Sequence, residues 1–517
     1  MTPEFAILFA ICAPLVAVPL MALARNNANL REGVTLAIAV VVFVAVANLF
    51  AGVIGGGRPT VGLGEMLPGL EISFTIEPLG MLFAGIASFL WIVTTVYSIG
   101  YMRGHHEKNQ TRFYMFFAIA ISSALGIAFS GNMLTLFVFY EVLTISTFPL
   151  VTHSGTEEAK RAGRVYLGIL IGTSIVLQLT AVIWTWTIAG TLDFTAGGIL
   201  RDKASGGLTA LLLAMYMFGI GKAAVMPFHR WLPAAMVAPT PVSALLHAVA
   251  VVKAGVFTVL KVTIYIFGID NLAALHSSVW LQYAAGGTIL IASLVAMRKD
   301  NLKARLAYST VSQLSYIVLG AMLASSLSAI GGAMHIAMHA FGKITLFFCA
   351  GAIMVASHKT EISQMRGLGR KMPITFACFL IGSLSIIGLP PFGGMWSKWY
   401  LALGAAETHQ VVFVAVLMIS SLLNVAYLVP IVVRGFFSAP EPDAHHAHHD
   451  EHHDDHSAGA APGDAGGPNN WKFSGFTEAP AACVGALAFT ATGCVALFFY
   501  ADAIFDFLLP LAKGGLP

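Results

Sequence analysis

Charged residues are scarce in this sequence. Of its 517 residues, only 10% are Asp, Glu, Lys or Arg, whereas 57% are hydrophobic and the mean hydropathy is +0.80. A soluble globular domain has about 25% charged residues. The shortage of charge excludes water as the main surroundings of the chain and indicates an integral membrane protein.

Cysteine is also rare, and its positions exclude a metal or disulfide framework. The five cysteines lie in apolar segments and none forms a CxxC pair, which is the spacing typical of zinc and iron–sulfur sites. We therefore expect no cofactor in this chain, and no nucleic-acid partner. The first apolar run lacks a preceding charged region, so residues 4–24 are expected to be a retained span rather than a signal peptide.

Long apolar runs fill most of the chain. About 18 to 20 apolar residues cross a bilayer as a helix, and a helix satisfies its backbone hydrogen bonds internally. The sequence predicts an all-α integral membrane fold of about fourteen transmembrane helices. The expected spans are 4–24, 33–54, 77–100, 113–130, 132–152, 164–189, 208–227, 241–267, 277–297, 304–325, 328–357, 373–400, 410–437 and 479–510.

The basic residues between the expected spans occur mainly in every second connection. Nearly all of them follow odd-numbered spans, and the connections after even-numbered spans hold only Arg58, Arg201 and Lys203. Lys and Arg are enriched in cytoplasmic loops. We therefore expect both termini outside, the basic loops in the cytoplasm, and a location in the plasma membrane.

Prolines interrupt the apolar pattern close to two lysines. Lys222, in the seventh span, and Lys398, in the twelfth, each lie near such a segment. Unwound backbone at membrane depth is tolerated where it lines a cavity or is buried, and paired broken helices indicate an ion site; the alternative is an ordinary proline kink. The expected helix-break residues are Pro227, Pro239, Pro241, Pro390 and Pro391.

The two breaks predict the domain organisation. They are five spans apart, an offset that reverses orientation in the membrane, so we expect two inverted five-helix repeats, spans 4–8 and 9–13. The predicted division is a three-helix segment 1–112, a first repeat 113–267, a second repeat 268–437, a cytoplasmic loop 438–478 and a final helix 479–517.

The predicted loop contains a histidine-rich tract. Its histidines alternate with acidic residues and can bind zinc or nickel weakly, or change charge near neutral pH. The alternative is a solvated loop without a mechanistic role. The seven histidines are His445, His446, His448, His449, His452, His453 and His456.

Several ionisable residues fall inside the predicted spans, where each charge costs about 2.5–3.5 kcal/mol. Such residues usually mark ion paths. Glu141 and Lys222 are expected to pair, because a separation of ~6 Å at an effective dielectric constant of ~20 gives an attraction of roughly 2.8 kcal/mol. Loosening this pair would let Lys222 release a proton; the alternative is a static ion pair between two helices.

A second group lies along the eleventh span. His335, His339 and Lys343 are spaced i, i+4 and i+8, which places them on one helical face, as a proton relay requires. His247 and Lys253 in the eighth span are expected to connect the first half to this stripe. Lys261, near the outer end of the same span, is expected to extend its ammonium group to the membrane surface.

These residues carry a resemblance to a known family. The segments from Lys222 to Ala235 (KAAVMPFHRWLPAA) and from Ala238 to His247 (APTPVSALLH) resemble the signature of proton-conducting antiporter-like proteins. VKAG at 252–255, NLKARLAYSTVSQ at 301–313 and GLPP at 388–391 extend the likeness over roughly residues 75–437. That family comprises large membrane subunits of respiratory complex I, of membrane-bound hydrogenases and of Mrp-type cation/proton antiporters.

The resemblance implies a fourteen-helix fold with two inverted repeats and a central polar axis. Its functional positions correspond here to Glu141, Lys222, Lys253, His335, His339 and Lys398. A lysine at 398 fits both the D type among the large Mrp subunits and the most distal complex I subunit, and the expected fourteen spans, without the long C-terminal lateral helix of that distal subunit, favour the Mrp type. The histidine-rich tract departs from the family pattern.

The leading hypothesis is therefore a secondary transporter subunit, without enzymatic activity of its own, in a multisubunit antiporter that exchanges Na⁺ or K⁺ for protons. Its partners would be other subunits of the complex. The second hypothesis is a proton-pumping membrane subunit of a redox-driven complex of the complex I or hydrogenase type.

Overall fold

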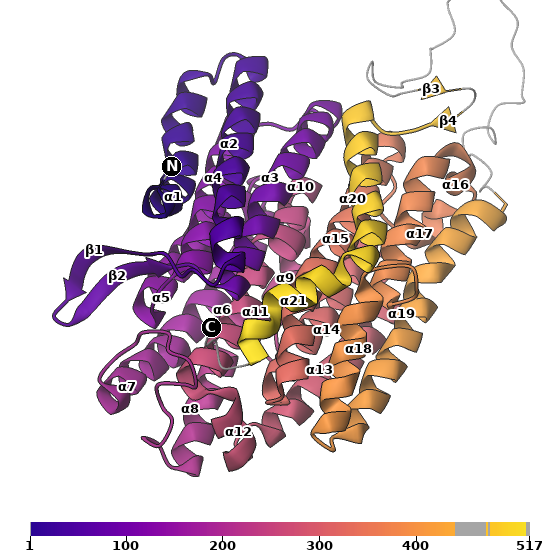
Figure 1. Ribbon diagram of the computed structural model, residues 1–517. Helices are drawn as coiled ribbons and strands as arrows, with labels where there is room; N and C mark the ends of the chain where they lie inside the picture. Colours follow the sequence, from indigo (N-terminus) through magenta and orange to yellow (C-terminus); the bar gives the residue numbers. More distant parts are fainter. Residues whose placement is uncertain (1, 440–471, 474–475, 513–517) are drawn as a thin grey trace, which may run out of the picture.

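The computed structural model describes residues 2–439, 472–473 and 476–512 (Figure 1). The histidine-rich tract predicted as a weak metal site lies outside these residues. The described part is a bundle of helices, and this confirms the predicted all-α membrane fold.

Eleven helical segments of the described residues are long and apolar enough to cross a membrane. They are α1 (Pro3–Leu23), α2 (Ala28–Ile54), α3 (Pro78–Gly104), α4 (Gln110–Phe129), α5 (Met133–Val151), the run α6–η1–α7 (Glu157–Ala189), the run α10–η4–α11–η5 (Thr240–Phe267), α13 (Val279–Arg298), α15 (Ser326–Ser357), α19 (Val411–Phe437) and α20 (Ala481–Phe499).

Three other predicted spans also form helices, but these are shorter or more polar. Two are interrupted: α8 (Gly206–Gly219) and α17 (Pro373–Ile387) each stop at a break. The third, α14 (Leu302–Met322), begins with Lys303 and Arg305 and carries many hydroxyl groups. The count of fourteen and the inverted symmetry stay predictions. The remaining helices are α9 (Trp231–Ala234), α12 (Ile269–Leu275), α16 (Leu368–Lys371), α18 (Gly394–Glu407) and α21 (Ala501–Ala512).

Both predicted breaks are present beside their lysines. After α8, a single 3₁₀ turn, η2 (Gly221–Ala223), is capped by Ala224, whose φ of 55° lies in the left-handed region. After α17, Gly388 has φ +89° and α18 begins six residues later at Gly394. Pro227, Pro390 and Pro391 lie within these two breaks. Pro239 and Pro241 lie where η3 (Ala235–Val237) ends and α10 (Thr240–Ala244) begins.

An antiparallel hairpin was missed by the all-helical prediction. Strand β1 (Thr60–Leu67) pairs with β2 (Leu70–Thr75), and Figure 1 shows the hairpin projecting from the bundle. The turn uses Gly69 at φ +76°, a conformation that glycine adopts without steric cost. Asn132, the residue that caps α5, donates from Nδ2 to the Glu71 carbonyl oxygen at 2.7 Å and so fixes β2 to the bundle.

The first and second halves meet at a buried centre. The run α10–η4–α11–η5 is fully buried in its apolar window, and it packs against α14 and α15. At the other end of the chain, α20 packs against α3, α15 and α17 (Figure 1). The C-terminal helix α20 therefore joins α3, near the N-terminus, to α15 and α17 of the second half.

Lys261 does not extend to the membrane surface as the sequence suggested. Its ammonium group is 1% exposed and lies 3.0 Å from the Glu77 carboxylate, at the start of α3, and it donates to the Ser130 carbonyl oxygen at 2.8 Å. The Phe194 ring covers it, with 4.4 Å from Nζ to the ring centroid. A carboxylate from another helix thus compensates this charge inside the protein.

Removing one partner of this pair is expected to destabilise the chain far more than removing both. Lys261→Met leaves the Glu77 carboxylate buried without a cation, which costs roughly 3–5 kcal/mol, whereas a neutral replacement of a whole buried pair is often tolerated. Thermal unfolding of the detergent-purified chain, followed by tryptophan fluorescence, should show a large loss for Lys261→Met and recovery of most of it in Lys261→Met/Glu77→Gln. Lys371→Met, at an exposed site, is the control; a single variant as stable as this control would contradict the expectation.

Candidate functional site

Lys222 is completely buried and is compensated by neutral groups. Its ammonium nitrogen donates to the Tyr140 carbonyl oxygen at 2.8 Å and to the Thr144 hydroxyl at 2.5 Å, both on α5. The same nitrogen lies 3.1 Å from the centroid of the Tyr140 ring, where the negative face of the π system attracts a cation. One turn of α5 therefore supplies every partner that this ammonium group has among the described residues.

The break after α8 determines where Lys222 lies. The Trp231 indole N–H donates to the Gly221 carbonyl oxygen at 2.9 Å, which closes the unwound segment on itself. Gly255 of α11 packs directly against the backbone of Lys222, and a Cβ atom there would clash with it. The Tyr140 hydroxyl accepts the Lys222 backbone N–H at 3.1 Å. Backbone and side chain of Lys222 are thus both held against α5.

Glu141 follows Tyr140 on α5, but it does not contact the lysine directly. Among the ion pairs of the described residues, none joins Glu141 to Lys222. Both carboxylate oxygens of Glu141 are buried and lack a hydrogen-bond partner in the structure. In this arrangement no hydrogen bond or ion pair joins Glu141 to Lys222 among the described residues.

The central element of the second group is a direct contact between the two halves. The Lys253 ammonium group on α11 makes a short hydrogen bond with Nδ1 of His339 on α15, and both residues are fully buried. Nε2 of His339 is left without a partner. A protonated Lys253 can only donate, so Nδ1 of His339 then accepts, which requires an imidazole that is not doubly protonated.

His335 lies one turn before His339 on α15. The two rings on α15 are 5.8 Å apart between centroids. Nδ1 of His335 lies 2.8 Å from the Ser397 hydroxyl of α18, and Nε2 lies 3.2 Å from Oε1 of Gln313 on α14. Tyr316 stacks on the ring with 5.7 Å between centroids. Both ring nitrogens of His335 therefore have polar partners.

Lys398 lies at the second break and uses the carbonyl end of α17. Its ammonium nitrogen donates to the carbonyl oxygens of Ile386 and Ile387 at 2.8 and 3.0 Å, and to the Ser421 hydroxyl at 3.1 Å. It also lies 4.8 Å from the centroid of the Tyr316 ring. The last carbonyls of a helix carry partial negative charge and favour a cation. Tyr316 thus contacts both His335 and Lys398.

Lys343 belongs to a separate branch of polar groups. It shares a helical face with His335 and His339, but its ammonium nitrogen donates to the Ser309 hydroxyl at 2.6 Å and to the Leu306 carbonyl oxygen at 3.3 Å. Ser309 accepts in turn from the Tyr427 hydroxyl at 2.8 Å. The structure therefore directs Lys343 toward α14 and α19.

His247 has no polar contact among the described residues. Neither ring nitrogen has a hydrogen-bond partner, and the side chain is fully buried. Its ring lies 4.5 Å from that of Phe347 on α15. His247 lies in the π-helical segment η4 (Leu245–Val249), which separates α10 from α11 (Val251–Lys261). The structure does not join His247 to Lys253 directly.

Sequence reasoning missed the neutral partners of these cations. Some of them lay within a quoted motif, because Ser309 and Gln313 both belong to the segment NLKARLAYSTVSQ. Their spacing of four residues places them on one face of α14, and this was a usable signal. The other missed groups are Tyr140, Thr144, Tyr316, Ser397, Ser421 and Tyr427.

Proton transfer is the chemistry that these groups can perform. Lysine and histidine exchange protons, and hydroxyl groups both donate and accept. None of the cations at 222, 253, 343 and 398 has a carboxylate within ion-pair distance in the described part of the chain. Small movements of their neutral partners can therefore change how strongly each holds its proton.

Family models, sequence relatives and a solved structure all point to the same family. A sequence model described as "NADH:quinone oxidoreductase/Mrp antiporter, TM" matches residues 130–424, and one described as "NADH-Ubiquinone oxidoreductase (complex I), chain 5 N-terminus" matches residues 68–114. The first match contains all eight residues predicted to transfer protons.

Individual relatives come from both branches of this family. NADH-quinone oxidoreductase subunit N of Desulforudis audaxviator is 31% identical over 450 residues, which are 86% of this chain and 89% of the relative. The A/B component of a probable K(+)/H(+) antiporter of Rhizobium meliloti is 32% identical over 426 residues, which are 80% of this chain but 42% of the relative.

A solved structure has the same fold. A chain of the Mrp complex from Dietzia sp. DQ12-45-1b superposes with a TM-score of 0.83 at 22% identity, and the match covers 100% of this chain and 98% of that chain. Because the family model spans more than half of the sequence and the Desulforudis relative matches most of it, the chain belongs to the NADH:quinone oxidoreductase/Mrp antiporter transmembrane family.

Proposed function

We propose that this chain is the proton-translocating subunit of a multisubunit antiporter that exchanges Na⁺ or K⁺ for protons. The observation that carries the proposal is the set of buried lysines held by carbonyls, hydroxyls and rings, with Lys253 hydrogen-bonded to His339 across the two halves. Buried ionisable residues in membrane proteins usually mark an ion path. The chain would then be a secondary transporter subunit and not an enzyme.

The proposed path begins at Lys222 and ends at Lys398. The charge of Glu141 favours a proton on Lys222, and a movement of α5 relative to the break would release it. The proton would pass by way of Lys253 to His339 and His335. His247 and Lys343 are the other residues predicted to transfer protons. Lys343 would belong to a side branch of the path, through its hydrogen bond to Ser309.

A second candidate function follows from the relatives. The Desulforudis relative is named as a subunit of an NADH-quinone oxidoreductase and matches almost its full length. The same path would then serve as a proton pump driven by a redox reaction in other subunits. In both cases this chain works with other subunits of a complex and has no cofactor of its own.

The location and topology belong to the same proposal. We place the chain in the plasma membrane with both termini outside and the histidine-rich loop in the cytoplasm, because the basic connections predict this orientation. Residues 113–267 and 268–437 would form the two inverted repeats that enclose the path.

The first test uses inverted membrane vesicles prepared from cells that express the complete gene cluster. Glu141→Ala and Lys222→Ala should each lower cation-dependent collapse of a pH gradient by roughly tenfold or more, since ~1.4 kcal/mol of lost interaction already changes an equilibrium tenfold. Lys160→Ala, on an exposed side chain, should behave as wild type. Assembly of each variant is checked by copurification of the other subunits.

The same vesicles separate the two candidate functions. Proton efflux that depends on Na⁺ or K⁺ and needs no reductant supports the antiporter. Gradient formation that requires NADH or another reductant, without a response to cations, would establish the redox-driven pump instead. Full activity of the Lys222→Ala variant would refute the path in either case.

A second prediction concerns the contact between the halves. His339→Gln keeps an acceptor for the Lys253 ammonium group but removes the ring that can pass a proton from one nitrogen to the other. If His339 carries the proton, this variant assembles normally while transport falls at least tenfold, like that of His339→Leu. The exposed His276→Gln is the matched control. Near-normal transport by His339→Gln would show that His339 positions Lys253 and does not carry the proton.

A further inference from the structure

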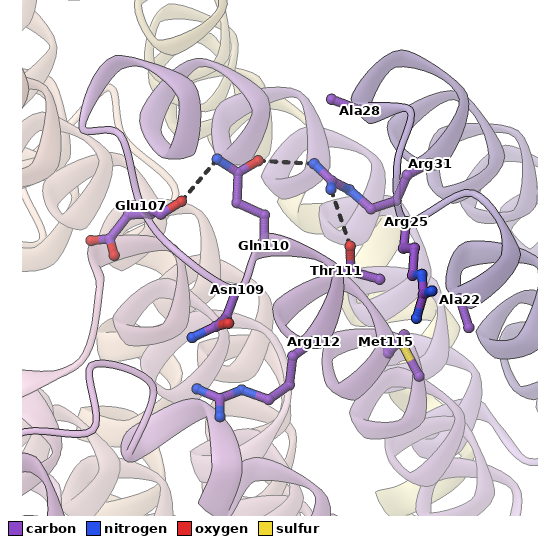
Figure 2. A pocket seen from close by; sticks show the side chains of 10 residues that line it. All are labelled: Ala22, Arg25, Ala28, Arg31, Glu107, Asn109, Gln110, Thr111, Arg112 and Met115. Atoms are coloured by element: carbon purple, nitrogen blue, oxygen red, sulfur yellow. Dashed lines mark hydrogen bonds between the residues drawn. The ribbon is translucent and has the colours of Figure 1, made fainter.

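A basic groove lies where three helices reach the same face of the bundle. Its volume is about 540 Å³, and Figure 2 shows side chains from α1, α2 and α4 around it. α1 ends at Leu23, α2 begins at Ala28 and α4 begins at Gln110, so the groove lies at the membrane boundary and not at the depth of Lys222. Its lining residues are Ala22, Arg25, Ala28, Arg31, Glu107, Asn109, Gln110, Thr111, Arg112 and Met115.

Positive charge dominates the groove. Three guanidinium groups, those of Arg25, Arg31 and Arg112, come from three different parts of the chain, and Glu107 is the one carboxylate among the lining residues. Arginine keeps its charge at every physiological pH and presents several N–H donors that match a phosphate group. The groove therefore has a net charge that favours an anion with phosphate geometry.

The arginines differ in how firmly they are held. Arg31 is buried and donates to Gln110 at 2.9 Å and to Thr111 at 3.2 Å, as Figure 2 shows, and its guanidinium group also lies 3.4 Å from the Glu32 carboxylate, while its Nε has no partner. Arg112 donates to the His153 carbonyl oxygen at 2.7 Å. The side chain of Arg25 has no hydrogen bond or ion pair in the described part of the chain. Fixed donors thus lie beside a free cation.

Exposed apolar side chains lie on the last turns of α1, close in sequence to the groove residue Arg25. Leu20 and Leu23, five and two residues before Arg25, are 43% and 83% exposed. A basic pocket between transmembrane helices at the headgroup level, next to exposed apolar side chains, suits a lipid with an anionic head. A soluble anion would use only the arginines, and an acidic protein segment would leave these leucines uncovered.

We propose that this groove binds the phosphate headgroup of an anionic phospholipid from the surrounding leaflet. The phosphate would accept from Arg25 and Arg112 beside the buried Arg31, and the acyl chains would lie along Leu20 and Leu23. This site is separate from the proton path, and it holds whether the complex is an antiporter or a redox-driven pump.

The test is a lipid titration of the delipidated full chain in neutral detergent, read by native mass spectrometry. Phosphatidylglycerol should bind more tightly than phosphatidylcholine. Arg25→Gln should weaken phosphatidylglycerol binding about fivefold and Arg25→Gln/Arg112→Gln about 25-fold, since each surface arginine contributes about 1 kcal/mol to binding an anionic lipid. The control is Arg161→Gln, an exposed arginine near the same end of the bundle, which should bind as wild type.

Arg25→Gln should not destabilise the fold, because the Arg25 side chain makes no hydrogen bond or ion pair within the described part of the chain. Equal phosphatidylglycerol binding by wild type and both groove variants would overturn the site. Competition by inorganic phosphate as effective as that by phosphatidylglycerol would show an anion site without lipid. A wild-type complex that binds no phosphatidylglycerol until its other subunits are removed would assign the groove to a protein partner.

Discussion

The rest of the structure depends on how ammonium groups are compensated away from water. A charge in the membrane interior is costly unless dipoles or an opposite charge surround it. Here the compensation comes mainly from backbone carbonyls and hydroxyls, and the break after α17 supplies two of these carbonyls to Lys398. Ending a helix inside the protein leaves carbonyl groups unbonded. The broken helix and the buried lysine therefore require each other.

Two lysines of α11 show what the choice of partner implies. Lys253 and Lys261 are two turns apart and equally buried, but Lys253 contacts His339 while Lys261 is paired with Glu77. An ion pair fixes the proton on the lysine, because losing it would leave a buried carboxylate alone. A histidine partner can take the proton itself. The first arrangement suits a structural lysine, and the second suits a lysine whose protonation changes.

Much of the fold could be predicted from hydropathy, and the partners of the site could not. Apolar runs and prolines located most helices and both breaks, since these depend on local sequence. The expected pairing of Glu141 with Lys222 rested on an assumed distance and stays a prediction, whereas the direct partners of Lys222, Tyr140 and Thr144, were not expected. Lys261 was misjudged because Glu77 lies in a distant part of the sequence. Tyrosine and threonine in an apolar helix give no local sign of what they contact.

The buried centre and the groove at the membrane boundary use different kinds of cation. The candidate proton carriers inside the bundle are lysines and histidines, which can release a proton, whereas the groove at the membrane boundary uses arginines, which cannot. Arg31, buried beside that groove, is bonded to neutral groups of α4 and to Glu32, so its permanent charge ties α2 to its neighbours. A permanent charge at the depth of Lys253 would block a path that requires alternate loss and gain of protons. The choice between lysine and arginine at these two places thus follows from whether the site must change its charge or keep it.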